Sequence, residues 1–180
     1  MSQVTETTSP LPSAEPAPQP DGEQMLQIVL GESPMLLPVS YLVEILTLPT
    51  SQVVPIFNLP AWVPGVYNWR GDILWIADLG HLLGASPWYQ QAGYGAKHTV
   101  VVLDRTYSRQ LRSEERSPLG LIVNRVEGMQ STDLGSLSQT APPDRLSDRL
   151  LTGDSAQPFI LGNSPNGPVL NGDAILDAMP

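Results

Sequence analysis

Short apolar runs closed by glycine or proline dominate the pattern along the chain. Runs rich in Val, Ile and Leu that end at turn residues are typical of β-strands. The predicted strands are 24–30, 35–39, 66–70, 73–79, 99–104, 119–126, 150–153, 158–162 and 168–170. Many short strands at this spacing, with few helical segments, predict an all-β barrel or sandwich.

Three segments are predicted to be helical or partly helical. Residues 40–46 start a short helix, because Ser40 is a suitable N-cap. Residues 78–84 form one helical turn that a glycine ends, and 171–179 form a short closing helix. Pro38 lacks a backbone N–H and favours an edge position for its strand. The segment from 128 to 143 is rich in turn residues.

One hairpin is predicted in the middle of the chain. The apolar runs 66–70 and 73–79 are separated only by Gly71-Asp72, which is a two-residue hairpin signal. A glycine at the first central position suits a type II′ turn. Arg70 then lies next to the tip of the hairpin.

The first 23 residues form a tail of different composition. They contain five prolines and four acidic residues but no basic ones. Such a segment buries too little apolar area to offset the entropy of ordering it. We expect residues 1–23 to be disordered and residues 24–180 to form the folded domain.

Composition and charge exclude several classes of function. The 180 residues include 9 Lys and Arg against 18 Asp and Glu, a net charge of −9, which opposes binding to nucleic acid or anionic lipid. The chain has no cysteine, two histidines and no phosphate-binding loop or nucleophile-elbow motif. We expect no metal site and no cofactor. The absence of a signal sequence or spanning segment predicts a soluble, cytoplasmic protein without membrane insertion.

Two features of the sequence indicate an interaction surface. All four tryptophans lie within 62–88, and they suit either interface contacts or core filling about equally. Arg70 is the only basic residue among the first 96, and Glu44 is similarly isolated among apolar residues. A paired Glu44 and Arg70 would hold two segments in register and mark a partner contact. The alternative is a solvent-facing charge at a turn.

The central motif resembles the CheW family of chemotaxis coupling proteins. The matching residues are Glu44-Ile45-Leu46, then Pro60, Gly65, Asn68, Arg70, Gly71 and Ile73, then Asp78-Leu79. The order and spacing of these positions follow the family pattern. The resemblance covers about residues 24–178 of the chain.

This resemblance implies two small packed β-barrel subdomains, one largely before and one after the middle of the chain. It implies a non-catalytic adaptor that joins the cytoplasmic tip of a chemoreceptor to the regulatory domain of a CheA-type histidine kinase, recruited to receptor arrays at the membrane. Glu44 and Arg70 would be the charge pair at the receptor-binding groove. The candidate partner-binding residues are Glu44, Asn68, Trp69, Arg70, Gly71 and Trp75.

Three positions depart from the family pattern. Trp69 replaces a typical leucine, Trp75 stands where proline or valine is usual, and Asn124 stands where aspartate is common. The two tryptophans indicate a variant such as the coupling proteins of type IV pilus motility and phototaxis.

Two other classes of function remain open on the sequence. A β-barrel enzyme or small-ligand carrier would line a deep apolar pocket with the aromatic residues of 62–88. A single-stranded nucleic-acid binder would use the same aromatics for stacking, supported by the locally basic stretch 97–125 with six positive and three negative residues. A flat surface around Trp69 or Trp75 would instead favour the adaptor.

Overall fold

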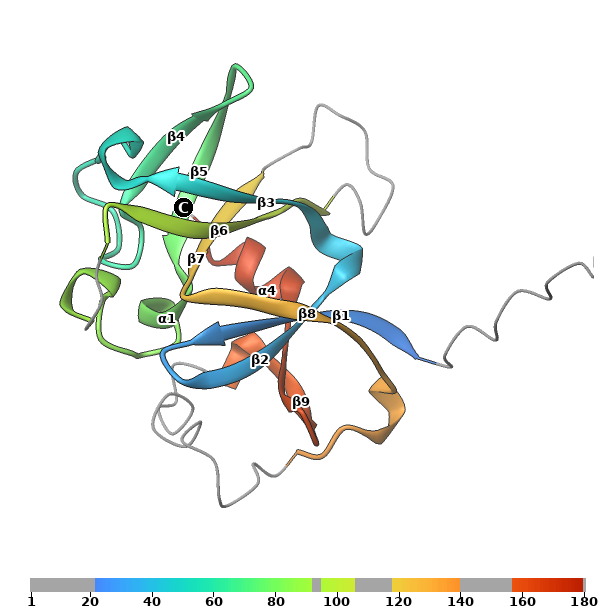
Figure 1. Ribbon diagram of the computed structural model, residues 1–180. Helices are drawn as coiled ribbons and strands as arrows, with labels where there is room; N and C mark the ends of the chain where they lie inside the picture. The colour runs from blue at the N-terminus through green and yellow to red at the C-terminus, as the bar shows by residue number, and fades with distance from the viewer. Residues whose placement is uncertain (1–21, 92–94, 106–117, 140–156, 180) are drawn as a thin grey trace, which may run out of the picture.

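The computed structural model describes residues 22–91, 95–105, 118–139 and 157–179. In these residues, ten strands form two curled five-stranded sheets, which confirms the all-β prediction (Figure 1). In order, the first sheet contains β8 (Arg125–Thr132), β1 (Glu23–Leu30), β2 (Ser33–Pro38), β10 (Gly167–Leu170) and β9 (Ile160–Ser164). The second contains β3 (Leu42–Pro49), β6 (Lys97–Leu103), β7 (Leu119–Val123), β5 (Asp72–Asp78) and β4 (Gly65–Trp69).

Short helices fill the connections between strands. They are η1 (Val39–Tyr41), η2 (Thr50–Gln52), α1 (Leu79–Leu82), η3 (Trp88–Gln90), η5 (Leu134–Ser136), η6 (Gln157–Phe159) and α4 (Gly172–Asp177). The helices predicted after residues 78 and 171 are confirmed, and each begins at a side-chain cap. Asp78 accepts the backbone N–H of His81, and Asn171 accepts that of Ala174.

The division of the chain between the two subdomains differs from the expected one. The first sheet takes strands from both ends of the chain, whereas β3 to β7 form the second sheet. The cause is long-range pairing: β8 pairs with β1, and β10 pairs in parallel with β2 through Val169 and Leu36. The two subdomains are therefore not the halves before and after the middle of the chain.

The helix predicted over 40–46 is wrong. Val39–Tyr41 form one 3-10 turn, and the chain then continues as strand β3. The partner strand β6 explains the difference, because it pairs with β3 from Leu42 to Pro49 and offers three consecutive valines. Tertiary pairing outweighs the capping signal of Ser40.

The hairpin tip is displaced by one residue from its predicted position. Trp69 pairs with Asp72, so Arg70 and Gly71 are the two turn residues. Both have positive φ, 55° and 94°, which is the signature of a type I′ turn. The predicted type II′ turn at Gly71-Asp72 is wrong, and Arg70 is a turn residue in the left-handed region.

Three further strand predictions need correction. Pro38 ends β2, which lies inside its sheet between β1 and β10 rather than at an edge. The run 119–126 is two strands, because the chain passes from the second sheet to the first at Asn124. The start of the predicted turn-rich segment belongs to β8, which continues to Thr132. The strand predicted at 150–153 lies outside the described residues.

Among the described residues, three apolar clusters form the core. The largest contains residues of both sheets, including Ile28 and Leu37 from the first and Val101 and Leu121 from the second, so it joins the subdomains. A second cluster, which includes Leu74 and Val100, contains residues of the second sheet on the opposite face of the same strands. The third consists of Met25, Leu36 and Val169 in the first sheet. Alternate residues of a strand point to opposite faces, so one sheet contributes to two clusters.

Candidate functional site

The predicted pair of Glu44 and Arg70 is formed, and Trp69 joins it. Glu44 lies on β3, while Trp69 ends β4 and Arg70 begins the turn. The Arg70 Nη2 donates to Glu44 Oε2, and the indole Nε1 of Trp69 donates to Glu44 Oε1. We refer to Glu44, Trp69 and Arg70 as the carboxylate cluster.

Burial decreases in steps through the carboxylate cluster. Trp69 is 7% exposed, the Glu44 side chain 22% and the Arg70 side chain 68%. The guanidinium carbon of Arg70 lies 5.2 Å from the centroid of the Trp69 ring, within the range of a cation–π contact. The cluster therefore connects the second apolar cluster to an exposed cation.

Asn68 and Gly71 shape the turn that presents Arg70. The side-chain Oδ1 of Asn68 accepts the backbone N–H of Gly71 at 3.1 Å. Gly71 has φ 94°, and a Cβ there would meet nothing within 4 Å, so its role is conformational. The residues predicted to shape the hairpin thus surround Arg70.

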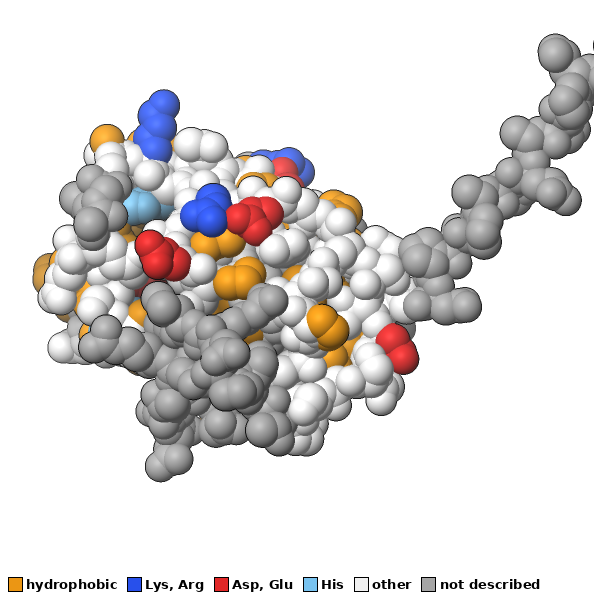
Figure 2. Space-filling view, turned by 60° about the horizontal axis from the view of Figure 1, so that its bottom comes forward, with side chains coloured by type: hydrophobic (Ala, Val, Ile, Leu, Met, Phe, Trp, Pro, Cys, Tyr) orange, Lys and Arg blue, Asp and Glu red, His pale blue; other side chains and the backbone are white. Residues whose placement is uncertain are grey.

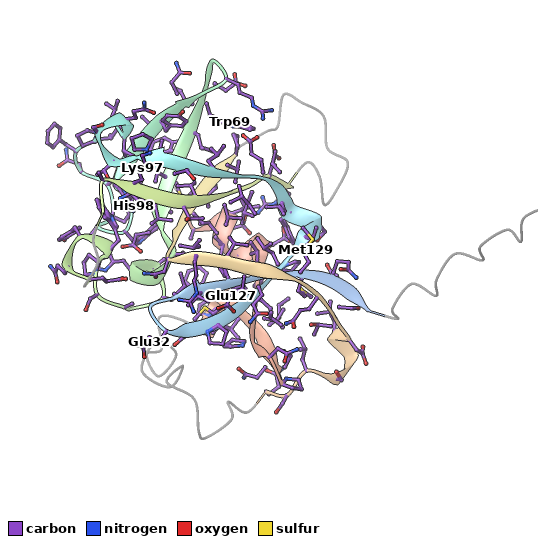
Figure 3. All side chains as sticks on the ribbon, in the orientation of Figure 1. Glu32, Trp69, Lys97, His98, Glu127 and Met129 are labelled. Atoms are coloured by element: carbon purple, nitrogen blue, oxygen red, sulfur yellow. The ribbon has the colours of Figure 1, made fainter. Side chains whose placement is uncertain are left out.

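Trp75 is placed apart from the carboxylate cluster. It pairs with Val66 on β4 and packs, half-buried, against the large cluster that joins the sheets. Trp69 packs within the second cluster on the other face of the hairpin. The structure therefore brings five of the six predicted site residues together and leaves Trp75 on the opposite face. Figure 3 shows where Trp69 lies relative to β3, β4 and β5.

The carboxylate cluster closes the second sheet. Its strands β3 and β4 stand at the two ends of the sheet order, yet Glu44 of β3 contacts Trp69 of β4. An isolated bridge between Val54 and Val66 adds two backbone hydrogen bonds of 2.8 and 2.9 Å beside it. The hairpin carrying Arg70 is thereby held against β3.

The sequence alone did not identify two exposed apolar residues close to the site. Ile45 is 43% exposed and Ile73 is 66% exposed. Ile45 pairs with Val101, and Ile73 lies two residues from Trp75 on β5, so both isoleucines face the same side as the large cluster. The alternation of β5 contained this signal, because it places Ile73 and Trp75 on one face.

A small cavity lies at a different end of the second sheet. It encloses about 130 Å³, and half of its lining residues are polar or charged, including Asp78, Lys97, His98 and Asn124. Of the four tryptophans, Trp88 lines it. The Asp78 carboxylate has a structural role, because its two oxygens accept the backbone N–H groups of His81 and Trp88. This is not the deep aromatic pocket that a ligand carrier would need.

His98 connects three segments beside this cavity. Its Nε2 lies 2.8 Å from the Thr50 hydroxyl, and its ring meets the Trp88 ring edge-on at 4.3 Å. Burial lowers the pKa of His98, and the nearby Asp78 partly offsets this effect. Lys97 and His98 are labelled in Figure 3, at the end of β6 away from Trp69.

The described part of the chain holds no group of three or more His, Asp or Glu side chains that could bind a metal ion. On the face drawn in Figure 2, basic and acidic side chains are few and intermingled rather than gathered into a patch of one sign. Half of the basic residues of the stretch 97–125 lie outside the described residues, and Lys97, Arg105 and Arg125 lie within them. None of the described helices has the length and hydropathy needed to cross a bilayer.

Comparisons with known proteins agree with this fold. The chain is similar in structure to the scaffolding protein TtCheW from Thermoanaerobacter tengcongensis, with a TM-score of 0.57 and 17% identity over 83% of this chain and 87% of that one. No match was found among curated proteins. A family model described as the CheW-like domain matches residues 24–177. The chain therefore belongs to the CheW-like domain family.

Proposed function

We propose that the protein is a non-catalytic adaptor that couples a chemoreceptor to a CheA-type histidine kinase. Family membership supports this function, as does the fold shared with a protein named as a scaffold. The observation that carries this proposal is the position of Arg70. Its exposed side chain lies at the tip of the hairpin and is held by the partly buried Glu44 of β3. An exposed arginine that is held in one position by a partly buried carboxylate is suited to recognition.

The surface around Arg70 supports protein partners. Ile45, next to Glu44 on β3, and Ile73, which pairs with Asn68 at the hairpin, expose apolar side chains, so a charged anchor and apolar contacts occur in one subdomain. Interfaces typically combine such apolar contacts with an arginine anchor. The proposed partners are the cytoplasmic tip of a methyl-accepting receptor and the regulatory domain of the kinase. Such contacts would recruit a cytoplasmic adaptor to receptor arrays at the membrane.

The narrower assignment to a type IV pilus motility or phototaxis system is also a proposal. It rests on Trp69, whose indole binds the Glu44 carboxylate in a way that an aliphatic residue could not. A receptor from such a system would then bind more tightly than a receptor from a flagellar system.

A ligand-carrier function has less support. The cavity near His98 is small and half of its lining residues are polar or charged, and Trp62, Trp69 and Trp75 do not line it. Small-molecule sites are usually larger and mainly apolar.

A binding experiment tests the adaptor proposal. The full chain is mixed separately with a purified cytoplasmic fragment of a methyl-accepting receptor and with a CheA-type regulatory domain. We expect both to be retained, and a protein lacking residues 1–21 to behave in the same way. Failure of both forms to bind either partner at tens of micromolar would overturn the proposal.

A further inference from the structure

We infer that Trp69 is a positioning residue for Arg70, an inference that rests on the adaptor function proposed above. The starting observation is how the Glu44 carboxylate is shared. Its Oε1 accepts the indole N–H of Trp69, and its Oε2 accepts Nη2 of Arg70. The carboxylate cannot rotate without losing one of these two hydrogen bonds.

The indole itself is fixed by the core. Trp69 is 7% exposed and belongs to the second apolar cluster, together with residues such as Leu74 and Val102. A packed ring in such a cluster occupies one rotamer. The packed core therefore fixes the indole, the indole orients the Glu44 carboxylate, and this carboxylate orients Arg70.

This arrangement prepares Arg70 for binding. A free arginine side chain at an exposed turn loses much rotamer freedom when it contacts a partner. Arg70 is 68% exposed, yet Glu44 and the face of the Trp69 ring already hold its guanidinium. Most of the ordering cost is thus met within the adaptor before the partner arrives.

The same geometry indicates which groups Arg70 recognises. Glu44 already neutralises its charge, and the chain carries a net charge of −9, so a second carboxylate would be repelled. In the described part of the chain, the guanidinium hydrogen-bonds to Glu44, and a guanidinium has five N–H donors. The remaining donors suit neutral acceptors such as backbone carbonyl or amide oxygens of the partner.

A double-mutant cycle with a receptor fragment tests the positioning role. Trp69→Phe keeps an aromatic ring and removes the N–H, and it should weaken binding of the receptor fragment by roughly tenfold. In an Arg70→Ala background the same change should have no further effect, because Trp69 acts through Arg70. Additive effects of the two changes would overturn the inference. Trp88→Phe is the matched control, since Trp88 packs against the same cluster away from Glu44, and binding should be unchanged.

Two further measurements separate this inference from the adaptor function. The NMR signal of the Trp69 indole N–H should shift when Glu44 is replaced by Gln in the free protein, and an unchanged signal would overturn the inference without any partner present. Raising the salt concentration should weaken receptor binding less than threefold, whereas a steep loss would show a partner carboxylate instead of neutral acceptors. If the wild-type chain binds no receptor fragment, the adaptor function fails, while the indole signal still reports on the contact with Glu44.

Discussion

The indole of Trp69 donates a hydrogen bond to the carboxylate of Glu44, and these residues lie on the two end strands of one five-stranded sheet. Their contact brings the edges of the curled sheet together. It also places Arg70, the next residue after Trp69, where it binds the same carboxylate. Closure of the subdomain and presentation of its exposed cation are therefore one structural feature.

Replacing Arg70 by Ala should separate recognition from stability. The side chain is 68% exposed, so the free energy of unfolding should change by less than about 1 kcal/mol. Binding of a receptor fragment should weaken by about 1–3 kcal/mol, because a charge-assisted hydrogen-bond donor is lost. Titration calorimetry and urea unfolding measure the two quantities. Arg125→Ala is the matched control, since Arg125 forms another exposed pair with Glu127 on β8, and unchanged binding of Arg70→Ala would remove the proposed anchor.

Gly65→Ala should open the second sheet. A Cβ on Gly65 would lie 2.1 Å from the carbonyl oxygen of Val54, and its φ is 152°. The Val54–Val66 bridge must therefore separate, and we expect a loss of about 2–4 kcal/mol in the free energy of unfolding. Urea titration measures it. Gly128→Ala is the control because a Cβ there meets nothing within 4 Å, so equal stability of the two variants would contradict the role of the close approach.

His98 should make stability depend on pH. Burial holds its pKa below its ordinary value of 6.5, so below that pH the unfolded chain binds more protons than the folded one. The contribution of neutral His98 to the free energy of unfolding is complete above pH 6.5, and it is lost as the pH falls from 6.5 toward the lowered pKa. His98→Gln should therefore reduce the difference in unfolding free energy between pH 7.5 and pH 5.5. An unchanged difference in His98→Gln would contradict the prediction.

Arg105 should anchor the C-terminal helix. Its Nε donates to Asp173 at 3.1 Å and its Nη2 to Asp177 at 2.6 Å, which connects the residues after β6 to α4. The Arg105 side chain is 28% exposed, so Arg105→Ala should lower the free energy of unfolding by about 1–2 kcal/mol. Hydrogen exchange should show faster opening of α4. Asp177→Asn should have a smaller effect because Asp177 is 68% exposed, and the reverse order would contradict this account.

Much of the fold could be read from local pattern. Strand 24–30, the valine-rich strand at 99–104 and the helix after residue 171 were predicted because alternation, β-branching and capping are properties of neighbouring residues. The association of Glu44 with Arg70 was a correct expectation for a related reason. Each was an isolated charge in apolar surroundings, where an opposite charge is the natural partner.

The predictions that were wrong concern segments whose structure depends on residues far away in the sequence. The segment 40–46 carries a helix signal, yet it becomes a strand because β6 pairs with it. The division between the subdomains also depended on pairing across the whole chain, which joins β1 to β8 and β2 to β10. A one-residue shift of the hairpin tip was decided by the pairing of Trp69 with Asp72.

By itself, the sequence determined the class of fold, the family and the two charged residues at the centre of the candidate site. Only the tertiary structure decided that Trp69 binds Glu44 and that Trp75 faces the other way. The physical reason is that the face of a strand is set by its register, and a shift of one residue reverses every side chain. Register depends on the partner strand and the turn, and curling of the sheet then brings β3 and β4 into contact.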